Sequence, residues 1–512
     1  MTKQPQGSSG ATPTLKRQWK SINWVQIRKS VHHLQVRIAK AVINQRWGKV
    51  QSLQHILVTS MGARLLAVKI VTSSKGKWTP GIDGVVWKSA TAKFMAAVSL
   101  KKRGYKAQPL RRVHIRKTNG KLRPLGIPTM KDRAMQALYA MALEPIAEIQ
   151  ADEHSYGFRP RRCVQDAIQQ CRAALACKNR ATWILEGDIK ACFDQIDHDW
   201  MLSHIPMDKT ILRQWLKAGF IENDLFNRTD AGTPQGSPIS PILANMVLDE
   251  LQAKIKEAAP KGGKVNFIRY ADDFICTAKD SQILTDIILP VIQNFMSERG
   301  LELSPEKTLV TQIDKGFDFL GYNIRKYEGS LTIKPAKEKV KQFTRKLKGC
   351  LTTMRFKHTH HVVSALNKKL QGWANAHRHC AASKFFSKIE HYLFQATWRE
   401  LKRRHPKKPA KWIKRRYFTS RNNYNWVLHG EEMKDGKKRT HYLLQMSTCR
   451  YRRHNKVKAA ATPFDPDFVE YFKKRDLYKL IARKEDKRRR VPNTTPWRRH
   501  LKGQMDLFPA GL

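Results

Sequence analysis

Two adjacent aspartates set between two apolar runs constrain this chain more than any other feature. Asp272 and Asp273 follow the run Phe267–Tyr270 and precede the run Phe274–Cys276. Apolar runs of this length are typical of buried strands, and a tight turn between them would hold both acids at the tip of a hairpin. Side chains of neighbouring residues in a strand point to opposite faces, so near a turn one acid can point into a site while the other lies beside it. A solvated Asp-Asp turn is the common alternative.

A third carboxylate makes a functional site the better interpretation. Asp188 ends another apolar run, Thr182–Ile189, although an ordinary helix cap or strand end could also place an aspartate there. Burying unpaired acids is costly, so clustered acids in apolar strands need a reason. Asp188 and Asp272 together suit a site for two Mg²⁺ ions, which phosphoryl transfer to a 3′-hydroxyl uses at a spacing of about 3.5–4 Å. Mg²⁺ prefers few carboxylates plus substrate phosphate oxygens.

The net charge of the chain points to a polyanionic partner. The 512 residues include 97 Lys and Arg against 42 Asp and Glu, a formal charge of +55. Full disorder is excluded because hydrophobic residues make up 41% of the chain. Nucleic acid is the expected partner, and an anionic membrane is the rival. No run approaches about 18 uncharged apolar residues, and Met1–Gln18 lacks the apolar core of a secretory signal, so we expect no membrane partner and a location in the bacterial cytosol or nucleoid.

The eight cysteines form no C-x-x-C pair. A zinc knuckle, zinc ribbon or redox motif is therefore not supported. We expect these residues to be buried thiols in a reducing cytoplasm.

Hydrophobic periodicity and charge divide the chain into five parts. An apolar stripe at helical spacing, from Ile27 to Val42, indicates an amphipathic helix near the N-terminus, whereas the middle of the chain mixes strand and helix signals. The pattern is helical again from Lys334 to Trp398 and then strongly basic. The expected parts are an N-terminal helical extension (1–75), a mixed domain (76–334), a helical domain (335–400), a basic region (401–470) and a basic tail (471–512).

Six sequence boxes resemble those of reverse transcriptases and occur in that family's order. The set is similar to bacterial group II intron reverse transcriptases, also called maturases, over roughly residues 20 to 470. Tyr270–Asp273 resembles the catalytic box. The other five are the two fingers motifs, the box with the first catalytic aspartate, the box that follows it and the primer grip, which lie at Gly120–Pro128, His154–Pro160, Asp188–Asp194, Gly232–Pro241 and Phe319–Tyr322.

The resemblance implies an α+β, right-hand polymerase fold. Fingers and palm would occupy 76–334, preceded by the helical extension and followed by a helical thumb or maturase (X) domain and a basic, DNA-binding-like C-terminal region. Asp188, Asp272 and Asp273 would be the catalytic acids, with Asp188 and Asp272 as the ligands of two Mg²⁺ ions. Phe319, Leu320 and Gly321 would form the primer grip.

The resemblance also implies a nucleotide site, although each residue has an ordinary structural alternative. Lys117 and Arg123 would face the triphosphate, because ammonium and guanidinium groups both bind phosphate. The alternative is that both lie on a solvent-exposed basic hairpin. Phe193 would exclude a 2′-hydroxyl or pack as a core residue. Gln235 and Gly236 would pack close to the nucleotide or form a plain turn, and Lys307 would act near the leaving phosphate or start a helix.

The basic regions would bind the intron RNA. Residues 370–375 resemble the thumb of the family, and Lys402–Arg416 continues it with Lys and Arg beside Trp398, Trp412 and Tyr417. Such a groove suits folded RNA better than base-specific readout, although core packing is an alternative for each aromatic residue. Many relatives end in an HNH nuclease with paired cysteines. Here Pro463–Pro466 resembles its lead-in, but the residues that follow hold no cysteine, so second-strand cleavage is not expected and the DNA primer would come from elsewhere.

Three functions remain open at this point. The first is an RNA-directed DNA polymerase that also promotes splicing and mobility of its host intron, with intron RNA, an RNA template with its DNA primer, target DNA and dNTPs as partners. The second is a splicing factor whose polymerase has decayed, which the three intact acids disfavour. The third is an intron-free family member used in DNA repair or phage defence. The sequence leaves the oligomeric state open.

Overall fold

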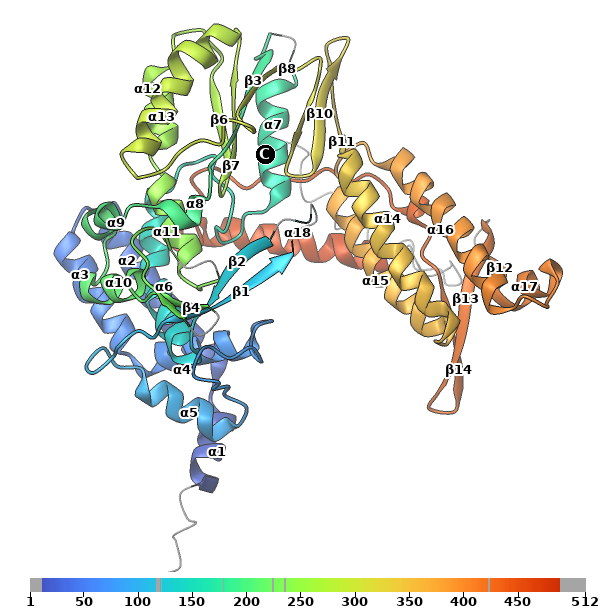
Figure 1. Cartoon of the computed structure of the whole chain (residues 1–512), viewed down its shortest axis with the longest axis horizontal. Helices are drawn as coiled ribbons and strands as arrows, with labels where there is room; N and C mark the ends of the chain where they lie inside the picture. The colour runs from blue at the N-terminus through green and yellow to red at the C-terminus, as the bar shows by residue number, and fades with distance from the viewer. Residues whose placement is uncertain are drawn as a thin grey trace, which may run out of the picture. The chain divides into compact units, whose positions relative to one another are not determined.

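A computed structural model describes residues 12–488 except 117–119, 121, 178, 223–224, 234–235 and 422–423 (Figure 1). The chain divides into two compact units. Unit 1 comprises Met1–Lys339 with two returning segments, Ala376–Ala382 and Tyr451–Pro466, and unit 2 comprises Val340–Asn375, Ser383–Arg450 and Asp467–Leu512. Helices and separate mostly antiparallel sheets confirm the expected α+β class.

Unit 1 begins with helices, as the N-terminal periodicity predicts. They are α1 (Thr12–Ser21), α2 (Trp24–Ile43), α3 (Trp47–Thr59), α4 (Met61–Ser73) and α5 (Ala90–Ser99). The Asn23 side chain caps α2, which buries Val31, Ile38 and Val42 of the predicted stripe. Among the described helices, none is by itself both long and apolar enough to cross a membrane. The pair α3 and α4 meets those criteria only when joined across a 66° bend.

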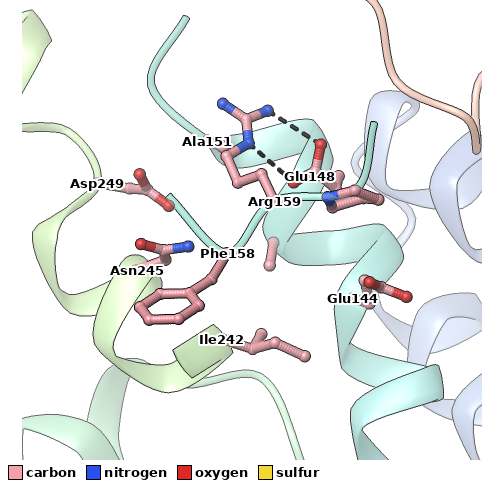
Figure 2. A pocket seen from close by; sticks show the side chains of 10 residues that line it. Glu144, Glu148, Ala151, Phe158, Arg159, Ile242, Asn245 and Asp249 are labelled. Carbon is pink, nitrogen blue, oxygen red and sulfur yellow. Dashed lines mark hydrogen bonds and ion pairs between the residues drawn. The ribbon is translucent and has the colours of Figure 1, made fainter. Parts of the chain in front are cut away.

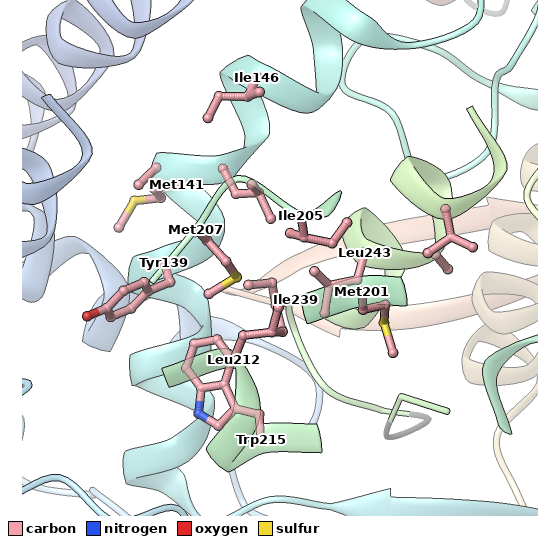
Figure 3. Packing of buried hydrophobic residues seen from close by; sticks show 14 of the residues in the cluster. Tyr139, Met141, Ile146, Met201, Ile205, Met207, Leu212, Trp215, Ile239 and Leu243 are labelled. Atoms are coloured by element: carbon pink, nitrogen blue, oxygen red, sulfur yellow. The ribbon is translucent and has the colours of Figure 1, made fainter. Parts of the chain in front are cut away.

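Helix α6 (Met130–Gln150) is the central helix of unit 1 and is buried along most of its length. It packs against α2, α4 and α11 (Ser240–Leu248). Figure 3 shows α6 side chains meeting those of α9 (His198–His204), α10 (Lys209–Leu216) and their neighbours, with Met141 and Ile146 on one side and Met207, Leu212 and Leu243 on the other. This apolar packing forms a rigid base for the loops that α6 precedes and follows.

The sheet that carries the acids has the strand order β6-β7-β3-β8 and is antiparallel throughout. We call it the carboxylate sheet; its strands are β3 (Trp183–Asp188), β6 (Asn266–Tyr270), β7 (Asp273–Ala278) and β8 (Leu309–Gln312). Strand β6 contacts both α7 (Val164–Leu175) and α12 (Leu251–Ala258), so helices flank the sheet (Figure 1). Short helices complete this region: α8 (Cys192–Gln195), a π-helical turn (Ile283–Ile288) and α13 (Leu289–Ser297).

Two further sheets belong to unit 1. The first has the order β2-β1-β4-β5, and its strands are β1 (Leu110–Arg116), β2 (Leu122–Ile127), β4 (Phe220–Glu222) and β5 (Leu225–Asn227). Strands β1 and β2 form the hairpin that the sequence predicts. The second is built from β9 (Phe317–Phe319), β10 (Tyr322–Tyr327) and β11 (Ser330–Pro335). The Ala381 N–H donates to the carbonyl of Ile333 at 2.9 Å, which attaches a returning segment to β11.

Unit 2 combines a helical group with a small sheet. Its helices are α14 (Lys337–Thr352), α15 (Thr359–His377), α16 (Ser383–Arg404), α17 (Ala410–Tyr417) and α18 (Val469–Arg488), with short 3₁₀ turns at Thr353–Arg355, Met446–Thr448 and Pro466–Phe468. The sheet orders β12 (Phe418–Arg421), β13 (Tyr424–Lys434) and β14 (Lys437–Tyr442). Gly430 lets β13 approach the start of α15, because a Cβ there would lie 2.3 Å from the backbone nitrogen of His360.

The cysteines only partly follow the expectation of burial. Cys171, Cys192, Cys276 and Cys380 are buried, but Cys177 is exposed, and Cys163, Cys350 and Cys449 are half-buried. Cys177 lies just beyond the end of α7, where nothing in the periodicity distinguished it from the buried thiol at Cys171.

Candidate active site

Strand register brings the three predicted acids together at one end of the carboxylate sheet. Asp188, the last residue of β3, is paired with Asp273, the first residue of β7. Strands β6 and β7 form a hairpin in which Tyr270 pairs with Asp273, so Ala271 and Asp272 are the turn. The hairpin expected from the two apolar runs is therefore present, and the acid of a neighbouring strand lies beside its tip.

The turn is held by the loop of the second fingers-like box. The Arg269 N–H donates to the carbonyl of His154 at 3.0 Å, and the Tyr156 N–H donates to the carbonyl of Arg269 at 2.9 Å. Ala271 has a positive φ of 57°, a conformation that costs a non-glycine residue energy unless its surroundings enforce it. The loop packs directly on Ala271 because residue 157 is a glycine: a Cβ there would lie 2.3 Å from the Ala271 nitrogen. The loop thus fixes the backbone that carries Asp272.

The three acids repel one another beside the buried strands: Asp188 and Asp272 are half-buried, and Asp273 retains exposed surface. Burial and the charge of Asp188 raise the pKa of Asp272 above its ordinary value. Burial, together with the charges of Asp272 and Asp188, raises the pKa of Asp273 to about 6. Such raised pKa values mean that the protein's own cations do not fully offset the cluster, and a bound divalent cation would do so.

Lys307 is a cation in direct contact with the cluster. Its Nζ lies 2.5 Å from Oδ2 of Asp188, and this hydrogen bond raises the pKa of the lysine. The backbone between them is also tied, since the Ser304 N–H donates to the Asp188 carbonyl at 2.8 Å. Lys307 lies in a turn before β8, so the alternative that it starts a helix is wrong.

The oxygen atoms available here fit Mg²⁺. The donor set consists of carboxylates alone, and Mg²⁺ is bound in enzymes through one or two carboxylates plus substrate phosphates and water. Cys192, a softer potential ligand near the acids, is buried, and Mg²⁺ prefers oxygen to sulfur, so this thiol does not compete. Asp188 and Asp272 could hold such ions between β3 and the hairpin turn.

A buried ionic network behind the turn was not anticipated from the sequence. The Arg269 side chain is completely buried; its guanidinium donates to Oδ1 of Asp249 at 2.5 Å and to Oδ1 of Asn245 at 3.3 Å. Nearby, Arg159 makes two parallel hydrogen bonds to Glu148, at 2.8 and 3.0 Å (Figure 2). The network joins the helices α6 and α11 to the strand that leads into the aspartate turn.

The small cavity in this network contains a carboxyl group with an unusual protonation equilibrium. Glu144 lines the cavity with Glu148 and Phe158 (Figure 2). Burial and the neighbouring Glu148 raise the pKa of Glu144 from 4.5 to about 7. The folded protein therefore binds this proton more tightly than the unfolded chain does, and its contribution to stability is present at low pH and is lost as pH rises through about 7.

We expect Glu144→Gln to remove the loss of stability that the wild type undergoes as pH rises through about 7. The variant should be more stable than the wild type at pH 8, by up to about 3 kcal/mol, and close to it at pH 5. Melting temperatures of both proteins at the two pH values check this. Glu153→Gln, at an exposed position of the following loop, is the matched control and should show no such difference. Equal melting temperatures for wild type and Glu144→Gln at pH 8 would contradict the assignment.

Comparisons with known proteins agree with the architecture of this site. Residues 115–324, which contain all three acids, match the family described as reverse transcriptase (RNA-dependent DNA polymerase). Residues 19–100 match the N-terminal domain of reverse transcriptase, and residues 340–418 match the maturase-specific domain of group II introns. Protein YkfC of Escherichia coli is 33% identical over 300 residues, a match covering 50% of this chain and 79% of that protein. The chain belongs to the group II intron reverse transcriptases.

Two further matches cover only part of each protein. The group II intron-encoded protein LtrA of Lactococcus lactis is 32% identical over 328 residues, which cover 51% of this chain and 54% of LtrA. A solved telomerase from Candida albicans, in complex with a fragment of telomeric RNA, has a TM-score of 0.34 and 13% identity and covers 61% of this chain and 67% of its own. The expected right-hand polymerase class, an RNA-directed DNA polymerase, is confirmed by the family match.

The residues expected at the nucleotide site of this reverse transcriptase are only partly visible. Arg123 lies on β2 and its charge lowers the pKa of Asp272, against the larger effect of burial, so the hairpin and the acids are within electrostatic reach. Lys117 and Gln235 lie outside the described residues. Gly236, with φ of 108°, packs against β2, where a Cβ would lie 2.9 Å from a methyl group of Leu125.

The structure describes Phe193 and the three residues expected to form the primer grip. Phe193 is half-buried, and its ring meets that of Phe158 edge-on at 6.4 Å between centroids. Phe319 is buried, and Leu320 and Gly321 form a two-residue turn with positive φ values of 51° and 84° between β9 and β10. Such turns suit tight hairpins. Whether these residues touch nucleotide or primer stays a prediction.

Aromatic side chains of unit 2 pack together, with a basic side chain against one of the rings. Trp398 and Trp426 lie 5.7 Å apart in a cluster that includes Phe394 and Phe418. The Nζ of Lys414 lies 4.5 Å from the Trp426 ring centroid. The aromatic residues therefore pack with one another, as the alternative interpretation has it, and also carry cations on their outer side.

Proposed function

We propose that this chain is a reverse transcriptase that uses two Mg²⁺ ions to copy intron RNA into DNA, and a maturase that binds its intron RNA and promotes splicing and mobility. The polymerase half of the proposal is supported chiefly by one observation, the convergence of Asp188, Asp272 and Asp273 at the end of one sheet. The maturase half is supported by the family match over residues 340–418.

In this proposal Asp188 and Asp272 hold the metal ions. When bound, the two ions would supply an activated primer 3′-oxygen and stabilise the leaving pyrophosphate. The protein's own part is to hold the carboxylates in place at the end of the carboxylate sheet. Asp273, with a pKa near 6, adds negative charge above that pH and so strengthens the field that attracts a cation.

Cationic side chains would then receive the triphosphate. Lys307, whose Nζ lies 2.5 Å from Asp188, would donate a hydrogen bond near the leaving phosphate. Arg123 would bind phosphate oxygens with its forked donor set. Phe193 would lie under the sugar and exclude a 2′-hydroxyl, which selects dNTPs over ribonucleotides.

Primer extension tests the polymerase half of the proposal. The substrate is a DNA primer annealed to an RNA template, with dNTPs and purified full-length protein. We expect extension that depends on Mg²⁺ and stops when the metal is chelated. A protein that splices its intron RNA but extends no primer would be a splicing factor only, and the polymerase assignment would be rejected.

Maturase action would be electrostatic, because the RNA supplies its own splicing chemistry. A protein that binds the active RNA fold more tightly than misfolded forms stabilises the active fold by linkage. The net charge of +55 makes intron RNA affinity depend steeply on salt through counterion release. With about five phosphates contacted, we expect affinity to fall about 10²–10³-fold between about 50 and about 200 mM salt.

The double variant Lys414→Gln, Arg415→Gln localises the effect to unit 2. Both side chains are exposed on α17, and losing two phosphate contacts should lower the slope of log affinity against log salt by about 2. The control is Lys254→Gln, Lys256→Gln on α12 of unit 1, also exposed. Filter-binding titrations measure the slopes. A wild-type affinity that does not change with salt would contradict an electrostatic mechanism.

A further inference from the structure

Three potential metal ligands of different kinds converge in unit 1, away from the catalytic acids. Cys163 precedes α7, Asp166 lies in its first turn, and His454 comes from the returning segment Tyr451–Pro466. Within the described residues, Sγ of Cys163, a carboxylate oxygen of Asp166 and a ring nitrogen of His454 all lie within 4.8 Å of one another. A sequence separation of 288 residues between the aspartate and the histidine hides this group from any motif search.

The spacing of the three donor atoms is close to that of a tetrahedral zinc site. Ligands at zinc distances of 2.0–2.3 Å lie about 3.3–3.7 Å from one another in a tetrahedron. Sγ of Cys163 and Nε2 of His454 are 3.8 Å apart. The two carboxylate oxygens of Asp166 are closer to these donors: Oδ2 lies 3.0 Å from Sγ and Oδ1 lies 2.9 Å from Nε2. Binding of an ion would have to lengthen these two distances by a few tenths of an ångström.

The chemistry of the donors selects the ion. A thiolate, an imidazole and a carboxylate form a mixed set that zinc accepts, whereas Mg²⁺ and Ca²⁺ prefer oxygen alone. With the thiol ionised, the thiolate and the carboxylate balance the two charges of Zn²⁺, and the thiol proton leaves to solvent on binding. That neutrality matters because the Asp166 side chain has no exposed surface.

A buried histidine beside the group points independently to a missing ligand. His379, in the other returning segment of unit 1, is 2% exposed, and neither of its ring nitrogens has a hydrogen-bond partner among the described residues. Buried polar groups of this kind are nearly always paired. Its ring centroid is 6.2 Å from that of His454. His379 lies outside the group of atoms within 4.8 Å of one another, so its side chain would have to turn toward a shared ion.

We propose that Cys163, Asp166 and His454 bind one Zn²⁺, with His379 as the fourth ligand. The ion would be structural. It would fasten both returning segments to α7, where the Val457 N–H already donates to Asp166 at 2.8 Å and Lys456 binds Gln170. Helix α7 contacts β6, the strand that leads into the aspartate turn, so the bound ion would also help to fix the position of that strand.

Metal analysis of the purified full-length protein tests the site. We expect one tightly held zinc per chain, and Co²⁺ in its place should give a thiolate-to-cobalt charge-transfer band, which the catalytic carboxylates cannot produce. Cys163→Ser keeps a side chain that caps α7 and bonds Asp166 but removes the thiolate. It should abolish the band and weaken zinc binding about 100-fold or more, as should His454→Gln.

Two further variants complete the test. His379→Gln should weaken zinc binding while leaving the charge-transfer band in place. Cys177→Ser, at the exposed thiol beyond the same helix, should change neither zinc content nor the band. Wild-type protein with no more zinc than Cys163→Ser, or a cobalt band that persists in that variant, would show that the three side chains are only a hydrogen-bonded group, and the proposal would be wrong.

Discussion

Replacing Asp272 by asparagine is expected to lower RNA-templated dNTP incorporation by at least about 10³-fold. Metal ions supply several kcal/mol of transition-state stabilisation in such reactions, and each 1.36 kcal/mol is a factor of ten. The side chain keeps its size and its turn between β6 and β7, so the loss comes from the missing charge. Single-turnover primer extension at saturating dNTP measures the rate.

The control for this variant lies at the opposite end of the same hairpin. Asp280→Asn removes one exposed carboxylate just beyond β7 and should leave the rate within about twofold, because an exposed charge so placed is screened by solvent. In the absence of metal, Asp272→Asn should melt at or above the wild-type temperature, since neutralising Asp272 relieves repulsion from Asp188, and Asp280→Asn should melt at the wild-type temperature. An Asp272→Asn enzyme that retained activity would place the metal elsewhere.

Replacing Arg269 by leucine is expected to destabilise unit 1 strongly. The side chain is fully buried, and its loss leaves Asp249 buried without its 2.5 Å ion-pair partner. Removing one member of such a pair costs about 3–5 kcal/mol. Because the backbone of Arg269 pairs with His154 and Tyr156, activity should fall together with stability.

The double variant separates the charge from the packing. Arg269→Leu with Asp249→Leu removes both charges, and exchanging a whole buried pair for apolar residues is often close to neutral. We therefore expect the double variant to recover most of the free energy of unfolding that the single variant loses, as measured by urea denaturation. A double variant as unstable as Arg269→Leu would mean that the guanidinium acts through its shape or its bond to Asn245 and not through the ion pair.

The sequence predicted the parts of the fold that depend on local pattern. Two apolar runs around Asp272 and Asp273 indicated a hairpin, and the structure has one with the turn at Ala271 and Asp272. The stripe from Ile27 to Val42 indicated a helix, and α2 buries three of its members. These predictions succeeded because side-chain period and turn position are encoded within a few residues.

Features that depend on distant pairing could not be read from the sequence. Lys307 was expected near a phosphate, but nothing in Leu303–Lys307 indicates its contact with Asp188, more than a hundred residues away. Arg269 lies on β6, whose other residues are mostly apolar, and its partner Asp249 lies just after helix α11. The returning segment with His454 runs through a basic, irregular stretch whose position beside α7 depends on tertiary packing alone.

The most direct test of the central claim is DNA synthesis on an RNA template by the purified protein, measured across a Mg²⁺ titration for wild type, Asp272→Asn and Asp280→Asn. The account predicts full-length cDNA from the wild type and from Asp280→Asn, rising with Mg²⁺, and no product above background from Asp272→Asn. Wild-type protein that binds intron RNA but makes no cDNA at any Mg²⁺ concentration, or cDNA synthesis that is unchanged in Asp272→Asn, would contradict it.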